Sequence, residues 1–325
     1  MKRAAVIGAG LVGLASAWYL LDHFDVTIYD LAGVGGGASG AATGLLHPFS
    51  GRLALHSWRA EEGMKVTREL LDVAEEALQK PVALRSGILR LAVADYQKVH
   101  FQTRVEEYPE TKWWSEEEVA EHLTGFVRAP GFWIPNGVTV FMRRYLEGLW
   151  LACQRRGATL VQERITDLSE LEKMDVAIVA TGAQSPQLVE CPSFELVKGQ
   201  AIVCHWNRAP LPWSVSSQGH LSPTEDPLLC EIGSTYEHQF SHPNPTSEGE
   251  EELRYKIGLF YPEAQKISFH SARAGIRLCP KQGYRPLVKR NSLKSWIITG
   301  FGSKGLIYHG LLSSDLIKMI IKEGV

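Results

Sequence analysis

Three glycines near the start of the chain have the spacing of a nucleotide-binding turn. Gly8, Gly10 and Gly13 form the pattern G-x-G-x-x-G, and Asp30 lies seventeen positions after the third glycine. In such a turn the first glycine permits a tight bend, the second admits a pyrophosphate close to backbone amides, and the third lets a helix pack on a strand. An acid at this distance can accept a hydrogen bond from a ribose hydroxyl. The chemistry expected here is dinucleotide binding.

The elements that position this turn follow from the residues around it. Residues 4–7 predict a buried strand, residues 11–21 a helix, and residues 26–29 a second strand that ends before the acid. The helix would begin with Leu11 and Val12, at the end that attracts phosphates. This βαβ context separates the turn from a secretory signal peptide, which the uncharged run after Lys2 and Arg3 otherwise imitates.

Composition favours an ordinary enzyme of a reducing compartment. The chain has 325 residues, 45% of them hydrophobic and 22% charged, which suits two domains or one large split domain. Its five cysteines are scattered without a C-x-x-C pair, so we expect neither a disulfide framework nor a metal site. No later segment has the roughly 18 uncharged apolar residues of a transmembrane helix. We therefore expect a cytoplasmic protein without a membrane partner.

Five later segments carry a second set of patterns. They read GGASGAATGLLHP at 36–48, DVAIVATGAQSP at 175–186, VKGQ at 197–200, RAGIRLCP at 273–280 and WIITGFGSKGLIYHG at 296–310. In this order they resemble the second cofactor loop, the A-T-G-x-x-S segment, the R-G-Q strand, the G-x-R-P segment and the terminal flavin loop of the D-amino-acid oxidase/glycine oxidase superfamily of FAD-dependent oxidoreductases. The third has lysine where the family has arginine. The matches extend in order from residue 3 to residue 317.

The resemblance implies an α/β fold with two interleaved parts. A Rossmann-type FAD-binding domain would comprise residues 1–85, 140–198 and 271–325, and an α+β substrate domain with an antiparallel sheet would comprise 86–139 and 199–270. The apolar spacing predicts helices over 61–78 and 143–156 and strands over 87–95, 158–165 and 176–180. We expect the glycine-rich run Gly33–Gly37 to be too flexible to open a helix.

The resemblance also indicates which residues hold FAD. In the second cofactor loop and beyond the strands of the first domain they are Ser39, Ala42, Thr43, Gly44, Leu45, Ile165, Ala180, Thr181 and Gly182. In the terminal loop they are Gly302, Ser303, Lys304, Gly305 and Leu306, whose amides would face the pyrimidine edge of the flavin.

Oxidation of a C–N bond by flavin needs a cation more than a base. Hydride passes from carbon to flavin N5 while the amine is neutral, and a forked arginine is the best ligand for a substrate carboxylate. Arg277 stands where the family places that arginine; the simpler interpretation is a surface arginine on a strand. Lys304 would stabilise negative charge on the flavin or a substrate acid, or would be a solvated loop lysine. His47 and Tyr236 are further candidates for the active-site wall, against the interpretation that they only pack.

Two substrates fit this chemistry. Segments 44–52, 232–253 and 300–306 look most like the FAD domain of the bifunctional bacterial enzyme that modifies wobble uridine in tRNA, although the chain leaves no room for a methyltransferase half. From Ala264 to Ser314 there are nine Lys or Arg and no Asp or Glu, which suits RNA or merely a solvated hairpin. We expect a small amine bearing a carboxylate as substrate, with oxygen as acceptor. A carboxymethylaminomethyl group on tRNA is the alternative, and an FAD-binding protein without turnover is a third.

Overall fold

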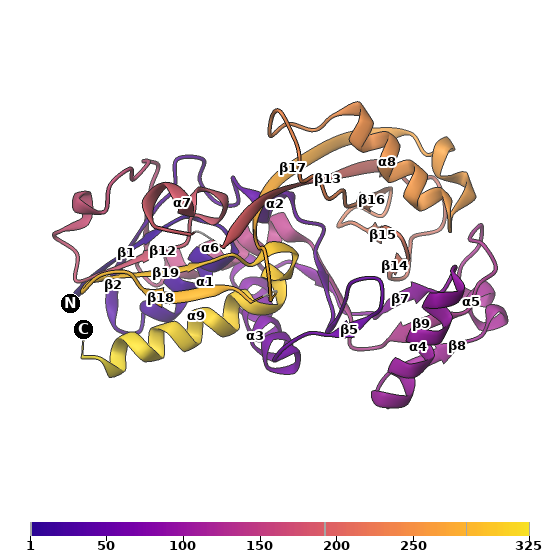
Figure 1. The fold of residues 1–325 in the computed structure, drawn as a ribbon, viewed down its shortest axis with the longest axis horizontal. Coiled ribbons are helices and arrows are strands. Elements are labelled where there is room, and N and C mark those ends of the chain that lie inside the picture. The colour runs from indigo at the N-terminus through magenta and orange to yellow at the C-terminus, as the bar shows by residue number, and fades with distance from the viewer. Residues whose placement is uncertain (1, 192, 284, 325) are drawn as a thin grey trace.

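The structure, a computed structural model, describes residues 2–191, 193–283 and 285–324. Two sheets of different construction lie side by side (Figure 1). The sheet on the left carries the two chain ends, and the sheet on the right is built from the middle of the chain.

The first sheet has the strand order β11-β2-β1-β12-β19-β18. Its strands are β11 (Thr159–Val161), β2 (Phe24–Tyr29), β1 (Lys2–Ile7), β12 (Val176–Val179), β19 (Ser295–Thr299) and β18 (Leu287–Arg290). All neighbours are parallel except β18 and β19. Along β1, Ala4 and Val6 enter one core and Ala5 and Ile7 another. Burial on both faces is what a parallel sheet requires.

Helices cover both faces of this sheet. The large core beneath one face is formed with α1 (Leu11–Leu20), α3 (Ala60–Leu78), α6 (Met142–Arg155) and α9 (Gly305–Lys322), which pack against one another. The short α7 (Ser185–Leu188) and η1 (Leu168–Leu171) lie over the other face. In α3 the buried residues recur at helical spacing, as with Leu70, Leu71 and Ala74, so one stripe faces the core.

The second sheet has the order β17-β13-β16-β15-β14-β7-β9-β8. Its strands are β17 (Phe269–Pro280), β13 (Phe194–His205), β16 (Leu229–Gly233), β15 (His220–Pro223), β14 (Ser214–Ser216), β7 (Ile88–Leu91), β9 (Gly131–Ile134) and β8 (Lys112–Trp114). It is antiparallel except between β14 and β7. Helix α8 (Ser247–Gly258) packs on it, and α4 (Asp95–Glu107) and α5 (Glu116–His122) lie at its outer end.

Short strands connect the two sheets. A small sheet in the order β3-β10-β6 joins β3 (Leu45–Leu46), β10 (Val138–Val140) and β6 (Ala83–Leu84), and a hairpin pairs β4 (Phe49–Ser50) with β5 (Leu55–His56). The α/β fold with a second, mainly antiparallel sheet is confirmed. Residues 194–198 and 271–280, which the expected division assigns to the FAD-binding domain, pair with each other inside the second sheet.

One local prediction is wrong. The glycine-rich run does open a helix, since α2 (Ala38–Ala41) begins directly after Gly37. The Ser39 hydroxyl fixes this turn by accepting a hydrogen bond from the Leu11 amide over 3.1 Å. β17 also passes so close that a Cβ at Gly275 would lie 2.7 Å from Ala38 Cα. These tertiary contacts order a segment that glycine content alone would leave loose.

None of the helices in the described ranges is long and apolar enough to span a membrane.

Candidate active site

A cavity of about 490 Å³ is lined by residues of both sheets. It collects most of the residues predicted to hold FAD, from the glycine turn, the second loop, the end of β12 and the terminal loop. They are Gly10, Leu11, Val12, Ser39, Ala42, Thr43, Gly44, Leu45, Ala180, Gly182, Gly302, Ser303, Lys304, Gly305 and Leu306. All four predicted catalytic residues, Arg277, Lys304, His47 and Tyr236, line the same cavity.

The glycine turn is built so that the N-terminus of α1 opens into this cavity. Gly8 has φ of +110°, and a Cβ on Gly13 would lie 1.8 Å from the Gly8 carbonyl oxygen. A Cβ on Gly10 would lie 2.8 Å from the Ser39 hydroxyl. Gly10 caps α1 without a side-chain hydrogen bond. The Leu11 amide donates to Ser39, and the amides of α1 that follow it, together with the positive helix end, are available to a pyrophosphate.

Asp30 lies beside the turn, outside the cavity wall. Its Oδ2 accepts from the Ala9 amide over 2.8 Å and its Oδ1 from the Ala32 amide over 2.9 Å. Each carboxylate oxygen can accept a further hydrogen bond. The expected contact with a ribose hydroxyl thus stays a prediction, and the visible task of Asp30 is to hold the glycine turn against the end of β2.

Two other predicted cofactor residues turn away from the cavity. The Ile165 side chain is buried with Leu171 and Val189 in the core over the outer face of the sheet. The Thr181 hydroxyl lies 3.2 Å from the Ser185 hydroxyl. Neither Ile165 nor Thr181 lines the cavity, so their contacts with FAD stay predictions.

The terminal loop presents a second helix end to the cavity. Here η4 (Gly302–Lys304) leads directly into α9, whose first residues line the wall. Partial burial lowers the pKa of the Lys304 ammonium. His309, fully buried in α9, donates from Nδ1 to the carbonyls of Gly305 and Leu306, both at 3.1 Å. Its Nε2 accepts from the Tyr145 hydroxyl over 2.7 Å, so His309 fixes the turn and is not a reacting group.

Arg277, on β17, lies over a gap made by Gly199 on the neighbouring strand. A Cβ on Gly199 would lie 2.3 Å from one terminal nitrogen of the Arg277 guanidinium. The guanidinium donates to Ser234 Oγ over 3.3 Å and to the Thr235 carbonyl over 3.5 Å, and it lies 4.8 Å from the centre of the half-exposed Tyr236 ring. Within the described part of the chain no carboxylate pairs with it. This is the state expected of an arginine that receives a substrate carboxylate.

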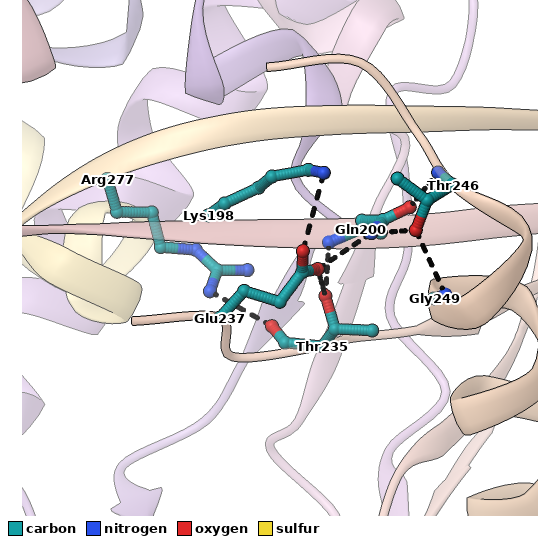
Figure 2. A network of polar contacts seen from close by, with 7 residues as sticks. All are labelled: Lys198, Gln200, Thr235, Glu237, Thr246, Gly249 and Arg277. Atoms are coloured by element: carbon teal, nitrogen blue, oxygen red, sulfur yellow. Dashed lines mark hydrogen bonds and ion pairs between the residues drawn. The ribbon is translucent and has the colours of Figure 1, made fainter. Parts of the chain in front are cut away.

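The carboxylate beside Arg277 is held by a buried lysine instead. Figure 2 shows the contacts of Glu237 with Lys198, Gln200 and Thr235, and the contact of Arg277 with the same Thr235. The Lys198 ammonium, only 1% exposed, lies 3.3 Å from Glu237 Oε2, while Oε1 accepts from Thr235 Oγ1 over 2.6 Å and from Gln200 Nε2 over 2.7 Å. Burial raises the pKa of Glu237, but these three donors outweigh it and the pKa lies below its ordinary value. Lys198 therefore neutralises Glu237 and leaves Arg277 available.

Arg273, four residues before Arg277 on the same strand, is engaged elsewhere. Its guanidinium pairs with Glu231 and donates to the carbonyls of Ala41 and Ala42 in the second cofactor loop, over 3.3 and 3.2 Å. Burial keeps the pKa of Glu231 above its ordinary value, although Arg273 opposes this effect. Arg273 ties the loop to the second sheet.

Two imidazoles line the cavity in their neutral form. Burial lowers the pKa of His47 to about 3, with smaller contributions from the charge of Arg90 and from His220. Burial likewise lowers the pKa of His220 to about 3, with contributions from Arg277 and Arg273. His47 Nδ1 and His220 Nε2 are buried without a hydrogen-bond partner. Each of these atoms can form a hydrogen bond with a bound molecule.

The sequence reasoning missed Arg90, His220 and Lys256, which also line the cavity. One signal was available for Arg90, since it is the only charged residue within the apolar run of residues 88–94. Four of the nine basic residues between Ala264 and Ser314 do not line the cavity, namely Lys281, Arg285, Lys289 and Arg290. Arg285 lies over the Trp58 ring, and Arg290 pairs with Glu323. These basic residues therefore do not gather at the cavity.

Comparison with known proteins agrees with this geometry. The family described as "FAD dependent oxidoreductase" matches residues 3–318. A relative, the bifunctional protein of tRNA 5-methylaminomethyl-2-thiouridine biosynthesis from Marinobacter nauticus, is 24% identical over 98% of this chain, and the chain spans about half of that protein, 55%.

Similar solved structures include glycine oxidase from Bacillus cereus (TM-score 0.85, 17% identity, 99% of this chain and 96% of that one). Iminodiacetate oxidase from Chelativorans is also similar (TM-score 0.83, 21% identity, 98% and 95%). The family match covers nearly the whole chain, and the open helix ends and glycine gaps of the cavity fit its cofactor. The chain belongs to the FAD-dependent oxidoreductase family, and its cofactor is FAD.

Proposed function

We propose that this protein oxidises the C–N bond of an amine that carries a carboxylate. FAD supplies the hydride acceptor. The α1 N-terminus would hold its pyrophosphate, and the terminal loop with the α9 N-terminus would hold the flavin. The observation that carries the proposal is Arg277, which lines the same cavity as these loops and has no acidic partner among the described residues. A bound carboxylate would receive the free edge of its guanidinium.

The charge of the cavity also suits an amine substrate. Arg52, Arg90, Lys256, Arg277 and Lys304 line it, and no Asp or Glu does so among the residues that the structure describes. Surrounding cations disfavour an ammonium, which lowers the pKa of a bound amine. The neutral amine is the form that loses hydride. The proton that the amine releases on binding goes to solvent, because imidazoles with a pKa of about 3 are too weakly basic to hold it.

The names of two similar enzymes support this class. Glycine oxidase and iminodiacetate oxidase are both named for amines that bear carboxylates. After hydride transfer the imine would hydrolyse in water, and oxygen would reoxidise the cofactor with release of hydrogen peroxide. Oxidative removal of a carboxymethyl group from a wobble uridine in tRNA is the second candidate, because the Marinobacter nauticus relative matches 98% of this chain.

An anaerobic screen distinguishes the candidates. The purified holoprotein is mixed with glycine, sarcosine, iminodiacetate and D-amino acids, and in parallel with tRNA that bears the carboxymethylaminomethyl group. Bleaching of the flavin absorbance by a small amine supports the proposal, and bleaching by the tRNA alone supports the second candidate. A holoprotein that dithionite reduces but no amine bleaches would have the fold and cofactor without this function.

A further inference from the structure

The strongest feature outside the roles assigned above is Arg90 on β7. Its side chain is 5% exposed and lines the cavity. The guanidinium donates to the Phe49 carbonyl over 3.1 Å and to the Gly51 carbonyl over 2.6 Å, and it lies 4.9 Å from the centre of the Phe101 ring. Its Nε is buried without a hydrogen-bond partner. No carboxylate pairs with Arg90 in residues 2–191, 193–283 or 285–324.

A buried cation without a counter-ion is costly, and two partly buried arginines that contact the second sheet avoid that cost. Arg254 also donates to two backbone carbonyls, but it pairs with Glu250 over 2.8 Å. Arg273 pairs with Glu231. Burial lowers the pKa of Arg90 to about 10, which still leaves it charged at neutral pH. Arg90 therefore lines the cavity as a cation whose charge is balanced by no side chain in the part of the chain that the structure describes.

The guanidinium of Arg90 also keeps hydrogen-bonding capacity. It has five N–H donors in a planar fork, of which the two carbonyls use two. The remaining donors include the Nε–H that has no partner. An anion entering the cavity would satisfy both the charge and this donor.

Arg90 and Arg277 are too far apart to share one small carboxylate. They lie on β7 and β17, with four strands between them in the sheet. At about 4.8 Å per strand, five steps amount to roughly 24 Å along the sheet. The sheet curves between these strands, which shortens the direct path (Figure 1). His47 and His220 also line the cavity. The charge of Arg90 contributes to the lowered pKa of His47, and the charge of Arg277 contributes to that of His220.

We infer that Arg90 binds a second anionic group of the substrate, carried on the substituent of its nitrogen. The preferred substrate is then an extended secondary amine with an anionic group at each end, one held by Arg277 and the other by Arg90. This inference rests on the proposed amine oxidation. A backbone phosphate of RNA suits the site poorly, since Arg90 is buried in the wall and not placed on the outer surface.

The test compares matched substrates with and without the second anion. N-(carboxymethyl)-, N-(2-carboxyethyl)- and N-(3-carboxypropyl)glycine are assayed beside N-alkylglycines of the same length. We expect at least one dianion to exceed its uncharged partner in kcat/KM by tenfold or more. Arg90→Leu should abolish that preference, because kcat/KM for the dianions should fall at least tenfold further than kcat/KM for the N-alkylglycines, while Arg90→Lys keeps part of the preference. Arg254→Leu, the matched control, should lower the Tm without changing the ratio.

Equal kcat/KM for every matched pair, or equal loss for both partners in Arg90→Leu, overturns the inference and leaves the proposed oxidation intact. If Arg90→Leu does not retain FAD, the wild-type holoenzyme still gives an answer. Dicarboxylates without an amine, such as glutarate and adipate, should perturb the flavin spectrum at concentrations at least tenfold lower than butyrate. Equal affinities would contradict a second anion site. This measurement needs no turnover, so it tests the site even if no amine bleaches the flavin.

Discussion

Replacing Gly199 by alanine displaces Arg277 without changing it. The new Cβ would lie 2.3 to 2.6 Å from three atoms of the Arg277 guanidinium, closer than real Cβ contacts ever come. The guanidinium must therefore move by at least about 1 Å to reach ordinary contact. The backbone of Gly199 does not need glycine, because its φ lies outside the left-handed region. The fold and the cofactor loops should remain as they are.

The expected loss follows from the strength of the displaced contact. A hydrogen bond to a charged group contributes about 1.5–3 kcal/mol, and 1.4 kcal/mol corresponds to a factor of ten. Gly199→Ala should therefore lower kcat/KM for a carboxylated amine by about ten- to a hundred-fold, mainly through KM. Carboxylate inhibitors should lose affinity by a similar factor.

Steady-state oxygen consumption measures this effect, with FAD content and Tm as checks on the fold. Gly258→Ala is the matched control, because it adds a methyl group on α8 with nothing within 4 Å. It should leave kcat/KM unchanged. If Gly199→Ala binds full FAD and turns over within threefold of the wild type, the carboxylate is not held by Arg277 in this position.

Three further predictions concern the support of the site. Lys198→Met removes the counter-ion 3.3 Å from Glu237. The Glu237 carboxylate should then compete with the substrate carboxylate for Arg277 and raise KM about tenfold. Adding Glu237→Gln should restore KM, and a double variant with the same high KM as Lys198→Met would refute the role of Lys198 as counter-ion. Gly13→Ala places a Cβ 1.8 Å from a carbonyl oxygen of the glycine turn, so the purified variant should lack FAD, and a yellow, fully loaded variant would be the contrary result. Burial holds the pKa of His47 and His220 near 3. Because the unfolded chain binds these protons at the ordinary pKa of about 6.5, their contribution to stability is complete above that pH and is lost as pH falls toward 3. Melting curves from pH 8 to 4 should show this decline, and His47→Asn should flatten it; an unchanged slope would count against a neutral buried His47.

The sequence was informative where local pattern and physical task coincide. The glycine turn has a fixed spacing because a helix must pack on a strand there, and a Cβ at Gly13 would overlap the Gly8 carbonyl. The amphipathic periods of α3 and α6 similarly predicted their bounds within one residue. Arg277 required the resemblance of its segment to a family, since an arginine on a strand carries no functional signal by itself.

Tertiary contacts decided the features that sequence could not give. Lys198 forms an ion pair with Glu237, which lies 39 positions later in the sequence. No short-range sequence pattern indicates this pair. Arg90 looks like a strand residue on the solvent face until its burial is known. The helix after Gly37 depends on Ser39 and on the passage of β17 beside it. In each instance the partner comes from a distant segment.

We propose that Arg277 recognises the carboxylate of an amine that FAD oxidises. The most direct test of this proposal is the rate of anaerobic flavin reduction by sarcosine and by dimethylamine, the same amine without the carboxylate, in the wild type and in Arg277→Met. We expect loss of the carboxylate to slow flavin reduction in the wild type by roughly ten- to a hundred-fold at equal concentration. Arg277→Met should slow sarcosine by a similar factor and leave dimethylamine unchanged. Equal slowing of both amines by Arg277→Met, or wild-type rates that do not depend on the carboxylate, would contradict this proposal.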